Sequence, residues 1–311
     1  RLVGSEMCIR DRKGRFSSAF LTSSGSEAVE WAVRLARKLT CKAEVFSFFE
    51  SIHGRTYLAA SMSGLPKRKV GYGPLAPGIV LLPYPNCARK PQSMSAEECG
   101  DACLQQANDI YRYGSSQSGA ALVVELCKGF GAVRPPKGYL PKLQQWAKEN
   151  GMLFIVDEIQ TGMGRTGRLF AMQKYGVTPD IVCLAKAFGG GMPLGAFVAR
   201  HEVMDTLQEN PALGHITTFG GHPVCCAAGL AALNYLVDNK VVERVETKGA
   251  LYEMLLKDHP AVREIRRSGL LLAVELGESA KLYRIMELFR EAGILSDWFL
   301  FCDTAFRISP P

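Results

Sequence analysis

Short, nearly continuous apolar runs recur along most of the chain. The run LFIVD at 153–157 is typical, because four apolar residues lead to a single carboxylate. These runs lack a regular alternation of polar and apolar positions, which is typical of strands covered on both faces. We predict strands at 45–49, 79–82, 121–126, 153–157, 180–185 and 195–199.

Segments with helical periodicity lie between or beside these strands. The clearest follows Gly25, where small or apolar side chains recur at helical spacing: Ala28, Trp31, Ala32, Leu35, Ala36 and Leu39. Further helices are predicted near 97–112, 140–149 and 222–237. Strands that alternate with helices predict an α/β fold, with a mainly parallel central sheet flanked by helices. In such folds the active site lies at the carboxyl ends of the strands.

The pattern changes near residue 238, where charged and longer helical segments replace the short apolar strands. The elements predicted from there on are a charged helix, an apolar strand, a second helix and a closing strand, at 240–257, 269–276, 280–292 and 305–308. They resemble a smaller α+β domain that is cut short. We therefore expect a large cofactor-binding domain over 13–237 and a partial C-terminal small domain over 238–311.

The two ends of the chain stand apart from this pattern. The segment RLVGSEMCIRDR at 1–12 lacks the apolar centre of a signal peptide and matches nothing that follows it. We interpret it as a non-native scar. The chain stops at 309–311, in what reads as the approach to a further segment. We therefore expect a fragment that lacks both ends.

Composition and charge narrow the class of protein. Hydrophobic residues make up 47% of the chain and charged residues 22%, which are values of a soluble globular protein. The longest apolar runs, such as 270–276, are far shorter than a membrane span, so we expect no membrane association. The net charge is +7, but the basic residues are dispersed and the one tight cluster is Lys67-Arg68-Lys69. We expect no nucleic-acid partner and a milder preference for anionic ligands.

Cysteine and histidine spacing argues against two further kinds of protein, those held by disulfides and those with a metal site. The chain has ten cysteines without a C-x-x-C pair, and the adjacent Cys225 and Cys226 have poor geometry for an ordinary disulfide. We interpret the cysteines as free thiols in a reducing compartment and expect a cytoplasmic location. The five histidines show no metal-ligand spacing, so we expect no metal site.

The first candidate site is Ser24-Gly25-Ser26-Glu27-Ala28, at the start of the helix that follows Gly25. Ser24 and Glu27 have the spacing of a capping box, which explains the motif without any ligand. The same geometry presents free backbone N–H groups, a small hydroxyl and the positive end of the helix dipole to a phosphate. Both interpretations stay open on the residues alone.

Two ionisable residues stand at the ends of predicted buried strands. Asp157 ends the strand in LFIVDEIQTGMGRTGR (153–168), where it either orders the following loop or faces a cation. Lys186 follows the strand in DIVCLAKAFGGGMPLGAF (180–197). It is either a surface lysine or an amine whose pKa burial lowers, as Schiff-base chemistry requires. We expect both residues at the same edge of the sheet.

In combination these motifs resemble the class III (omega) aminotransferases, fold-type I pyridoxal-phosphate enzymes that include ornithine, acetylornithine and 4-aminobutyrate aminotransferases. The resemblance runs from about residue 16 to 311. It implies that Gly25 and Ser26 bind the cofactor phosphate and that Asp157 pairs with the pyridine nitrogen. It also implies that Gln160 contacts the ring hydroxyl and that Lys186 holds the cofactor as a Schiff base.

The resemblance extends to two further motifs. HITTFGGHP at 215–223 is similar to the family's H-G-T-T-F-G-G-N-P, whose second threonine corresponds to Thr218. This threonine reaches the cofactor phosphate of the partner subunit, which implies a homodimer. Arg307 in FRISPP matches the family's arginine that binds a substrate carboxylate.

Several positions depart from the family pattern. Ile52 replaces the aromatic residue that stacks on the cofactor ring, and we expect it to cover the ring by dispersion. The family's V-E-P-x-Q-G-E-G-G becomes VELCKGFGA at 124–132, which keeps Glu125 at the cofactor site but has Lys128 and Phe130 in place of glutamine and glutamate. The lost glutamate pairs with the substrate-binding arginine in several members. We therefore hypothesise that Arg307 is unpaired and always available to a carboxylate.

The resemblance implies transfer of an amino group from an amino acid or ω-amine to a keto acid, with 2-oxoglutarate as the expected acceptor. Lys186 would act as general base and acid, while Asp157 keeps the ring nitrogen protonated. Two alternatives stay open. One is a pyridoxal-phosphate-dependent aminomutase or racemase on the same scaffold, and the other is an inactive relative that serves binding or assembly.

Overall fold

A computed structural model describes residues 16–87, 90–212, 214–299 and 302–311. The segment 1–12 lies outside the described residues, so its interpretation as a scar stays a prediction.

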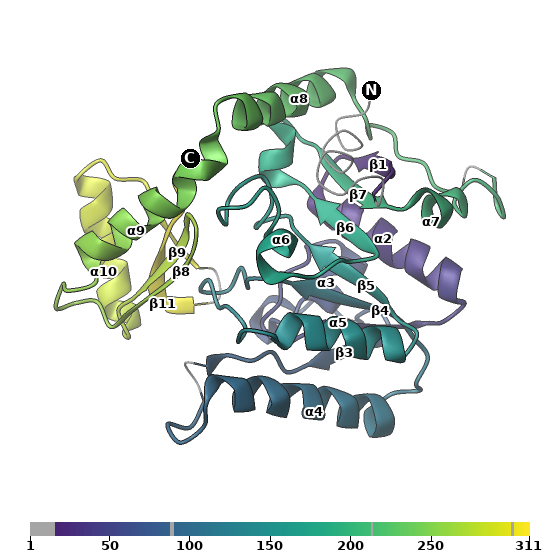
Figure 1. Cartoon of the computed structure of the whole chain (residues 1–311), viewed down its shortest axis with the longest axis horizontal. Coiled ribbons are helices and arrows are strands. Elements are labelled where there is room, and N and C mark those ends of the chain that lie inside the picture. The colour runs from purple at the N-terminus through teal and green to yellow at the C-terminus, as the bar shows by residue number, and fades with distance from the viewer. Residues whose placement is uncertain (1–15, 88–89, 213, 300–301) are drawn as a thin grey trace.

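The larger of two sheets forms the centre of the molecule (Figure 1). Its strands are β1 (Ser18–Thr22), β2 (Glu44–Phe48), β3 (Ile79–Leu82), β4 (Gly119–Glu125), β5 (Leu153–Asp157), β6 (Ile181–Leu184) and β7 (Gly195–Ala199). They lie in the order β1-β7-β6-β5-β4-β2-β3. The neighbours from β3 to β6 pair in parallel, whereas β7 is antiparallel to β6 and β1. The predicted mainly parallel sheet is confirmed.

Helices cover both faces of this sheet (Figure 1). They are α2 (Gly25–Thr40), α3 (Tyr57–Met62), η1 (Pro66–Arg68), α4 (Ala96–Gly114), α5 (Tyr139–Glu149), α6 (Ala171–Tyr175), η3 (Lys186–Gly189), α7 (His201–Asp205) and α8 (Pro223–Asp238). Side chains of α2, α3 and α7 pack on one face, and those of α4, α5, α6 and α8 pack on the other. The predicted helices at 97–112, 140–149 and 222–237 correspond to α4, α5 and α8.

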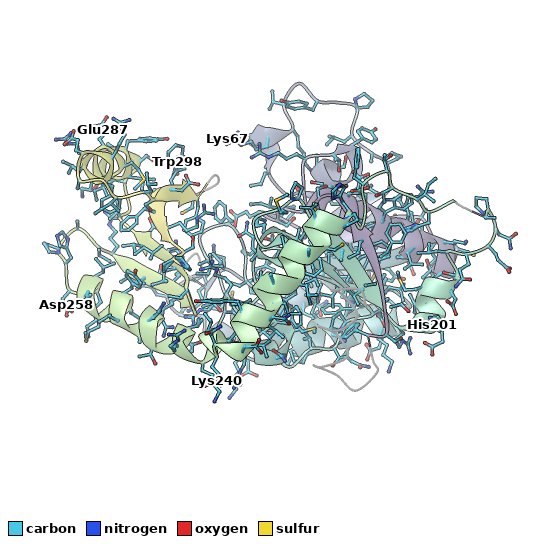
Figure 2. The ribbon with its side chains drawn as sticks, turned by 90° about the horizontal axis from the view of Figure 1, so that it is seen from above. Lys67, His201, Lys240, Asp258, Glu287 and Trp298 are labelled. Carbon is cyan, nitrogen blue, oxygen red and sulfur yellow. The ribbon has the colours of Figure 1, made fainter. Side chains whose placement is uncertain are left out.

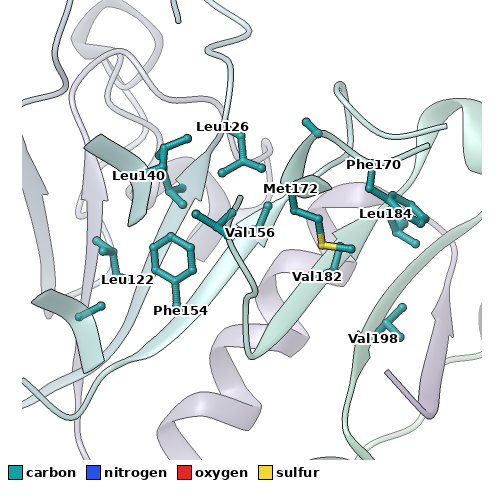
Figure 3. Close-up of a cluster of buried hydrophobic side chains, with 14 of the residues drawn as sticks. Leu122, Leu126, Leu140, Phe154, Val156, Phe170, Met172, Val182, Leu184 and Val198 are labelled. Carbon is teal, nitrogen blue, oxygen red and sulfur yellow. The ribbon is translucent and has the colours of Figure 1, made fainter. Parts of the chain in front are cut away.

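Burial on both faces explains the continuous apolar runs. Along β5, Phe154 and Val156 lie in the cluster that includes Leu140 of α5, as Figure 3 shows. Ile155 points the other way, into the cluster that includes Leu35 of α2. Each successive residue of the strand is therefore removed from water, which favours an apolar side chain at every position.

A second, antiparallel sheet has four strands in the order β10-β11-β9-β8. The elements of this part are η4 (Val241–Arg244), α9 (Val245–Leu256), β8 (Glu264–Ser268), β9 (Leu271–Glu275), α10 (Ser279–Glu291), β10 (Asp297–Phe299) and β11 (Cys302–Ile308). Figure 2 shows Lys240 where the chain leaves α8 for this part, Asp258 just after α9, Glu287 on α10 and Trp298 on β10. Among the described residues, no helix is both long and apolar enough to cross a bilayer.

Three strands were not predicted from the sequence, and each lacks a sustained apolar run. β1 has a polar residue at each end, β8 is EIRRS with one apolar residue, and β10 has only three residues. The charged helix expected at 240–257 is divided into η4 and α9. The division into domains at residue 237 stays a prediction.

Candidate active site

Three ionisable residues gather at one edge of the large sheet. Glu125 ends β4 and Asp157 ends β5, and the two are register partners. Lys186 begins η3, just after the neighbouring strand β6. Because adjacent parallel strands place their carboxyl ends at the same edge, the expected proximity of Asp157 and Lys186 follows from the strand order.

The Asp157 carboxylate is buried and accepts two hydrogen bonds. Its Oδ2 lies 2.8 Å from Nδ1 of the buried His53, and its Oδ1 accepts from the backbone N–H of Ile159 at 3.0 Å. A carboxylate is an acceptor, so His53 Nδ1 supplies the proton of this bond. No local pattern marks His53 as a site residue, because its partner Asp157 lies 104 positions away in the sequence. Its Nε2 is buried and has no hydrogen-bond partner among the described residues.

Lys186 occupies a strained backbone position with φ of 50°, in the left-handed region that a side chain disfavours. Its side chain reaches solvent, but surrounding protein replaces much of the water around the amine. This desolvation lowers the pKa of Lys186, while the nearby carboxylates of Asp157 and Glu125 act in the opposite direction. Water contact at one side and enclosure on the others suits an amine that must meet a ligand.

The N-terminus of α2 lies against the segment that leads to Lys186. A Cβ at Gly25 would stand 2.8 Å from Ile159 Cδ1 and 3.2 Å from Ala185 Cβ, so only glycine fits there without displacement. Ser24 caps the helix by accepting from Glu27 N at 3.2 Å. The expected capping box is incomplete, because the Glu27 carboxylate accepts from Ser23 N and not from the backbone of Ser24. These contacts place the positive end of the helix dipole beside Lys186.

The segment around Ile52 closes another side of the site. Ser26 Oγ accepts from Arg55 N at 3.2 Å, and Gly54 passes so close that a Cβ would lie 2.3 Å from that oxygen. Glu125 accepts from the backbone N–H of Ile52 at 2.9 Å. The structure thus brings Ser26, Ile52 and Glu125 into one connected group.

Gln160 lies against Gly129, a backbone partner of Glu125. The Oε1 atom of Glu125 accepts from Gly129 N at 3.0 Å, and a Cβ at Gly129 would meet the Gln160 amide at 2.8 Å. Gln160 therefore belongs to the same group as Glu125.

Arg307 is paired, so the hypothesis of an unpaired arginine was wrong. Its Nη2 lies 3.1 Å from Oδ2 of Asp297, the residue opposite it on β10. Position 130 is occupied by a buried Phe that packs with Phe299 in a separate apolar cluster. A cross-strand neighbour has therefore replaced the expected glutamate as partner. Burial lowers the pKa of Lys186, and the positive charge of Arg307 contributes in the same direction.

Thr218 is exposed on the loop between α7 and α8. It lines a surface hollow together with Ser23 and Glu27, next to the N-terminus of α2. The apolar neighbours Ile216 and Phe219 are also largely exposed. Its expected contact with a partner subunit's phosphate stays a prediction.

A basic hollow of ≈ 460 Å³ opens beside Ile52 and Gly54. Its positive potential favours anionic ligands near the site. The cations that line it are Arg55, Lys67, Arg68 and Lys69. In contrast, no cluster of His, Cys, Asp or Glu suited to a metal ion is present among the described residues.

The sequence model of Aminotransferase class-III matches residues 7–311. The chain belongs to the class-III aminotransferase family. It is 38% identical to an acetylornithine aminotransferase of Methanopyrus kandleri over 85% of its own length, but it spans only 62% of that relative. It is also 37% identical to the acetylornithine aminotransferase of Methanothermobacter thermautotrophicus, over 94% of this chain and 69% of the relative. The expected family is confirmed.

Solved structures of ω-transaminases have the same fold as this chain. The Pseudomonas jessenii ω-transaminase in complex with PMP aligns with a TM-score of 0.91 at 30% identity, over 99% of this chain and 73% of that one. This confirms fold-type I. The class-III family depends on pyridoxal phosphate, the cofactor expected from the sequence.

The described residues fit this cofactor. The glycine-led N-terminus of α2 abuts Ala185, so an anion-binding helix end stands beside the Lys186 amine. Asp157 provides a buried carboxylate within the same group, and His53 Nε2 is a buried polar atom with no partner in the part of the chain that the structure describes. A phosphate, a cationic ring nitrogen and an aldehyde carbon each find a matching protein group here.

Proposed function

We propose that the chain transfers an amino group from an amino acid or ω-amine to a keto acid, with 2-oxoglutarate as acceptor and pyridoxal phosphate held by Lys186. The supporting observation is the proximity of three groups: the partly desolvated Lys186 amine, the buried Asp157–His53 pair and the α2 N-terminus against Ala185. A binding protein needs no amine of lowered pKa at this position.

Each residue has a separate task in this proposal. Pyridoxal phosphate, when bound, supplies a ring that accepts electrons from the substrate carbon. Gly25 and Ser26 hold a phosphate with backbone N–H groups and the helix dipole. Asp157, fixed by His53, presents its negative charge to a protonated ring nitrogen. Lys186 Nζ would act as general base and then as general acid, moving a proton from the substrate carbon to the cofactor carbon that carries the nitrogen, because a lowered pKa leaves more of the amine neutral.

The remaining predicted residues bind and orient. Ile52 covers the ring, Gln160 contacts its hydroxyl, and Glu125 fixes the backbone of Ile52. Arg307 binds the substrate carboxylate after it releases Asp297.

A homodimer completes the proposed site, with Thr218 reaching the partner's cofactor. The exposed apolar side chains of Ile216 and Phe219 beside it support this proposal, because a dimer would remove them from water. Sedimentation of the purified protein should give twice the chain mass of 34.0 kDa. A cytoplasmic location stays a prediction from the cysteines.

The visible spectrum with pyridoxal phosphate tests the proposal. We expect a yellow absorbance band that requires Lys186, is lost in Lys186→Ala and fades when a suitable amine is added. Lys148→Ala is the matched control, because Lys148 is exposed on α5. A band of equal strength in Lys186→Ala would overturn the assignment of the lysine.

Product analysis separates transfer from the alternative reactions. With an amine donor, we expect turnover only when 2-oxoglutarate is present, with glutamate as the second product. Turnover without any keto acid would instead indicate an aminomutase or racemase. A Lys186-dependent band that no amine changes would indicate a relative that binds the cofactor without catalysis.

A further inference from the structure

Lys128 is a buried cation at the edge of the candidate site. Its side chain is only 2% exposed, and its Nζ donates to the Phe49 carbonyl at 2.9 Å. The ammonium stands 4.5 Å from the centre of the Tyr84 ring and 5.3 Å from that of Phe48. A carbonyl and two aromatic faces compensate only part of the cost of burying a charge. The buried charge of Lys128 therefore requires a further stabilising interaction.

The charges around Lys128 supply that interaction. Glu125 at the end of β4 and Glu50 after β2 attract the ammonium, whereas burial opposes its charge and lowers the pKa of Lys128 to about 8. Burial raises the pKa of Tyr84 well above its usual range, so this phenol stays neutral. Lys128 is therefore a buried cation near Glu125, and Tyr84 contacts both residues: its ring centre lies 4.5 Å from the Lys128 ammonium, and its hydroxyl donates to the Glu125 carbonyl oxygen at 3.3 Å.

Glu125 needs a nearby cation because each of its two carboxylate oxygens accepts a hydrogen bond. Its Oε2 accepts from Ile52 N and its Oε1 accepts from Gly129 N, at 2.9 and 3.0 Å. Only an ionised carboxylate accepts freely through both oxygens. Burial raises the pKa of Glu125, while Lys128 and His53 lower it and Asp157 raises it again.

We propose that Lys128 is a positioning residue for the cofactor, because its ammonium keeps Glu125 ionised. The ionised Glu125 in turn holds the backbone N–H groups of Ile52 and Gly129, and Gly129 lies against Gln160. The inference rests on the proposed function for the identity of the ligand. Lys128 itself touches neither substrate nor cofactor. It acts through Glu125, so its effect depends on pH.

The test compares the pyridoxal-phosphate dissociation constants of wild type and Lys128→Gln at pH 6.5 and 9.5. The glutamine removes the charge but keeps a donor for the Phe49 carbonyl. We expect about tenfold weaker binding at pH 6.5, equivalent to one lost hydrogen bond. The difference should shrink at pH 9.5, where wild-type Lys128 has also lost most of its charge. Lys148→Gln, an exposed control, should match wild type at both pH values.

A double-mutant cycle distinguishes positioning from simple packing. In a Glu125→Gln background the partner of Lys128 is gone, so adding Lys128→Gln should have no further effect on cofactor affinity at pH 6.5. Equal losses of affinity at both pH values, or additive losses in the double variant, would show that Lys128 only fills space and would overturn the proposal. Unchanged affinity in Lys128→Gln would overturn it as well.

Denaturant unfolding of the cofactor-free protein separates this proposal from the proposed function. Lys128 has a folded pKa of about 8, below its usual 10.5, so between these values the unfolded chain binds a proton that the folded chain has lost. Wild type should therefore gain stability relative to Lys128→Gln as pH rises through this window, about tenfold in the folding equilibrium per pH unit. An identical pH dependence in both proteins would disprove a buried ammonium, whatever the cofactor spectrum shows.

Discussion

Asp157 and Glu125 end neighbouring strands as buried carboxylates, and each accepts two hydrogen bonds from this chain. Such bonds stabilise a buried negative charge that would otherwise be costly. The partners of Asp157 are a side chain and a backbone N–H, whereas both partners of Glu125 are backbone N–H groups. A substitution of His53 therefore removes one hydrogen-bond partner of Asp157. The partners of Glu125 are backbone groups, so a substitution affects its ionisation mainly through nearby charges.

The Arg307–Asp297 pair leads to a prediction about substrate carboxylates. Asp297→Asn should strengthen the binding of a carboxylate substrate such as 2-oxoglutarate by up to about fivefold, because a partly exposed ion pair contributes at most about 1 kcal/mol. Its KM should fall while that of an amine without a carboxylate stays unchanged. Asp303→Asn is the control, since Asp303 is exposed on the same strand, β11. Equal changes in KM for both substrates would show that Asp297 does not compete with the substrate carboxylate for Arg307.

At the scale of elements, two helices begin with a capping serine but differ in their surroundings. Ser95 forms a complete capping box with Glu98 at the start of α4, where both residues are exposed. Ser24 caps α2, whose next residue, Gly25, abuts the segment before Lys186. One helix start therefore contributes to stability alone, while the other also shapes the site.

Two substitutions at these helix starts should behave differently. Ser95→Ala should lower the free energy of unfolding by about 1 kcal/mol without changing cofactor affinity, because it removes only a cap. Gly25→Ala should weaken pyridoxal-phosphate binding about tenfold, since its methyl would displace Ile159 or Ala185 at a cost of about 1–3 kcal/mol. Fluorescence titration with the cofactor and denaturant unfolding measure the two effects. Cofactor loss in Ser95→Ala would argue against a local role for the α2 end.

At the scale of the whole molecule, the two sheets meet around the loop that follows β5. Arg165 of this loop donates to the carbonyl oxygens of Leu270 and Pro310. Glu158, earlier in the loop, accepts from the backbone of Met172 at 2.7 Å and from the Thr161 hydroxyl. The loop therefore links the edge that bears Lys186 to the part of the chain that bears Arg307.

Glu158 should make the stability of the molecule depend on pH. Burial raises the pKa of Glu158 to about 7, above its usual value of 4.5. Between these values the folded chain holds a proton that the unfolded chain has lost, so the free energy of unfolding falls as pH rises through this window. Glu158→Gln should flatten this dependence by a few kcal/mol in total, measured by denaturant unfolding at pH 5 and pH 7.5. An unchanged slope in the variant would exclude Glu158 as its source.

The sequence by itself determined most of the elements and the edge of the sheet at which Asp157 and Lys186 meet. Burial on both faces makes a central strand continuously apolar, so β2 to β7 could be predicted from local patterns, as could α2 with its start at Gly25. Asp157 and Lys186 could be placed together because parallel strands share one edge for their carboxyl ends. The strands with mixed composition, such as β8, could not be predicted, because their burial depends on neighbours that the pattern does not reveal.

Only the tertiary structure decided which side chains pair. His53 and Asp157 are 104 positions apart, and Lys128 and Phe49 are 79 apart, so their contacts depend on the order of strands in the sheet. Arg307 is paired with Asp297 by the register of two short strands. A local pattern specifies what each residue can do, but sheet order and register specify which residues meet, because they bring together segments that are distant along the chain.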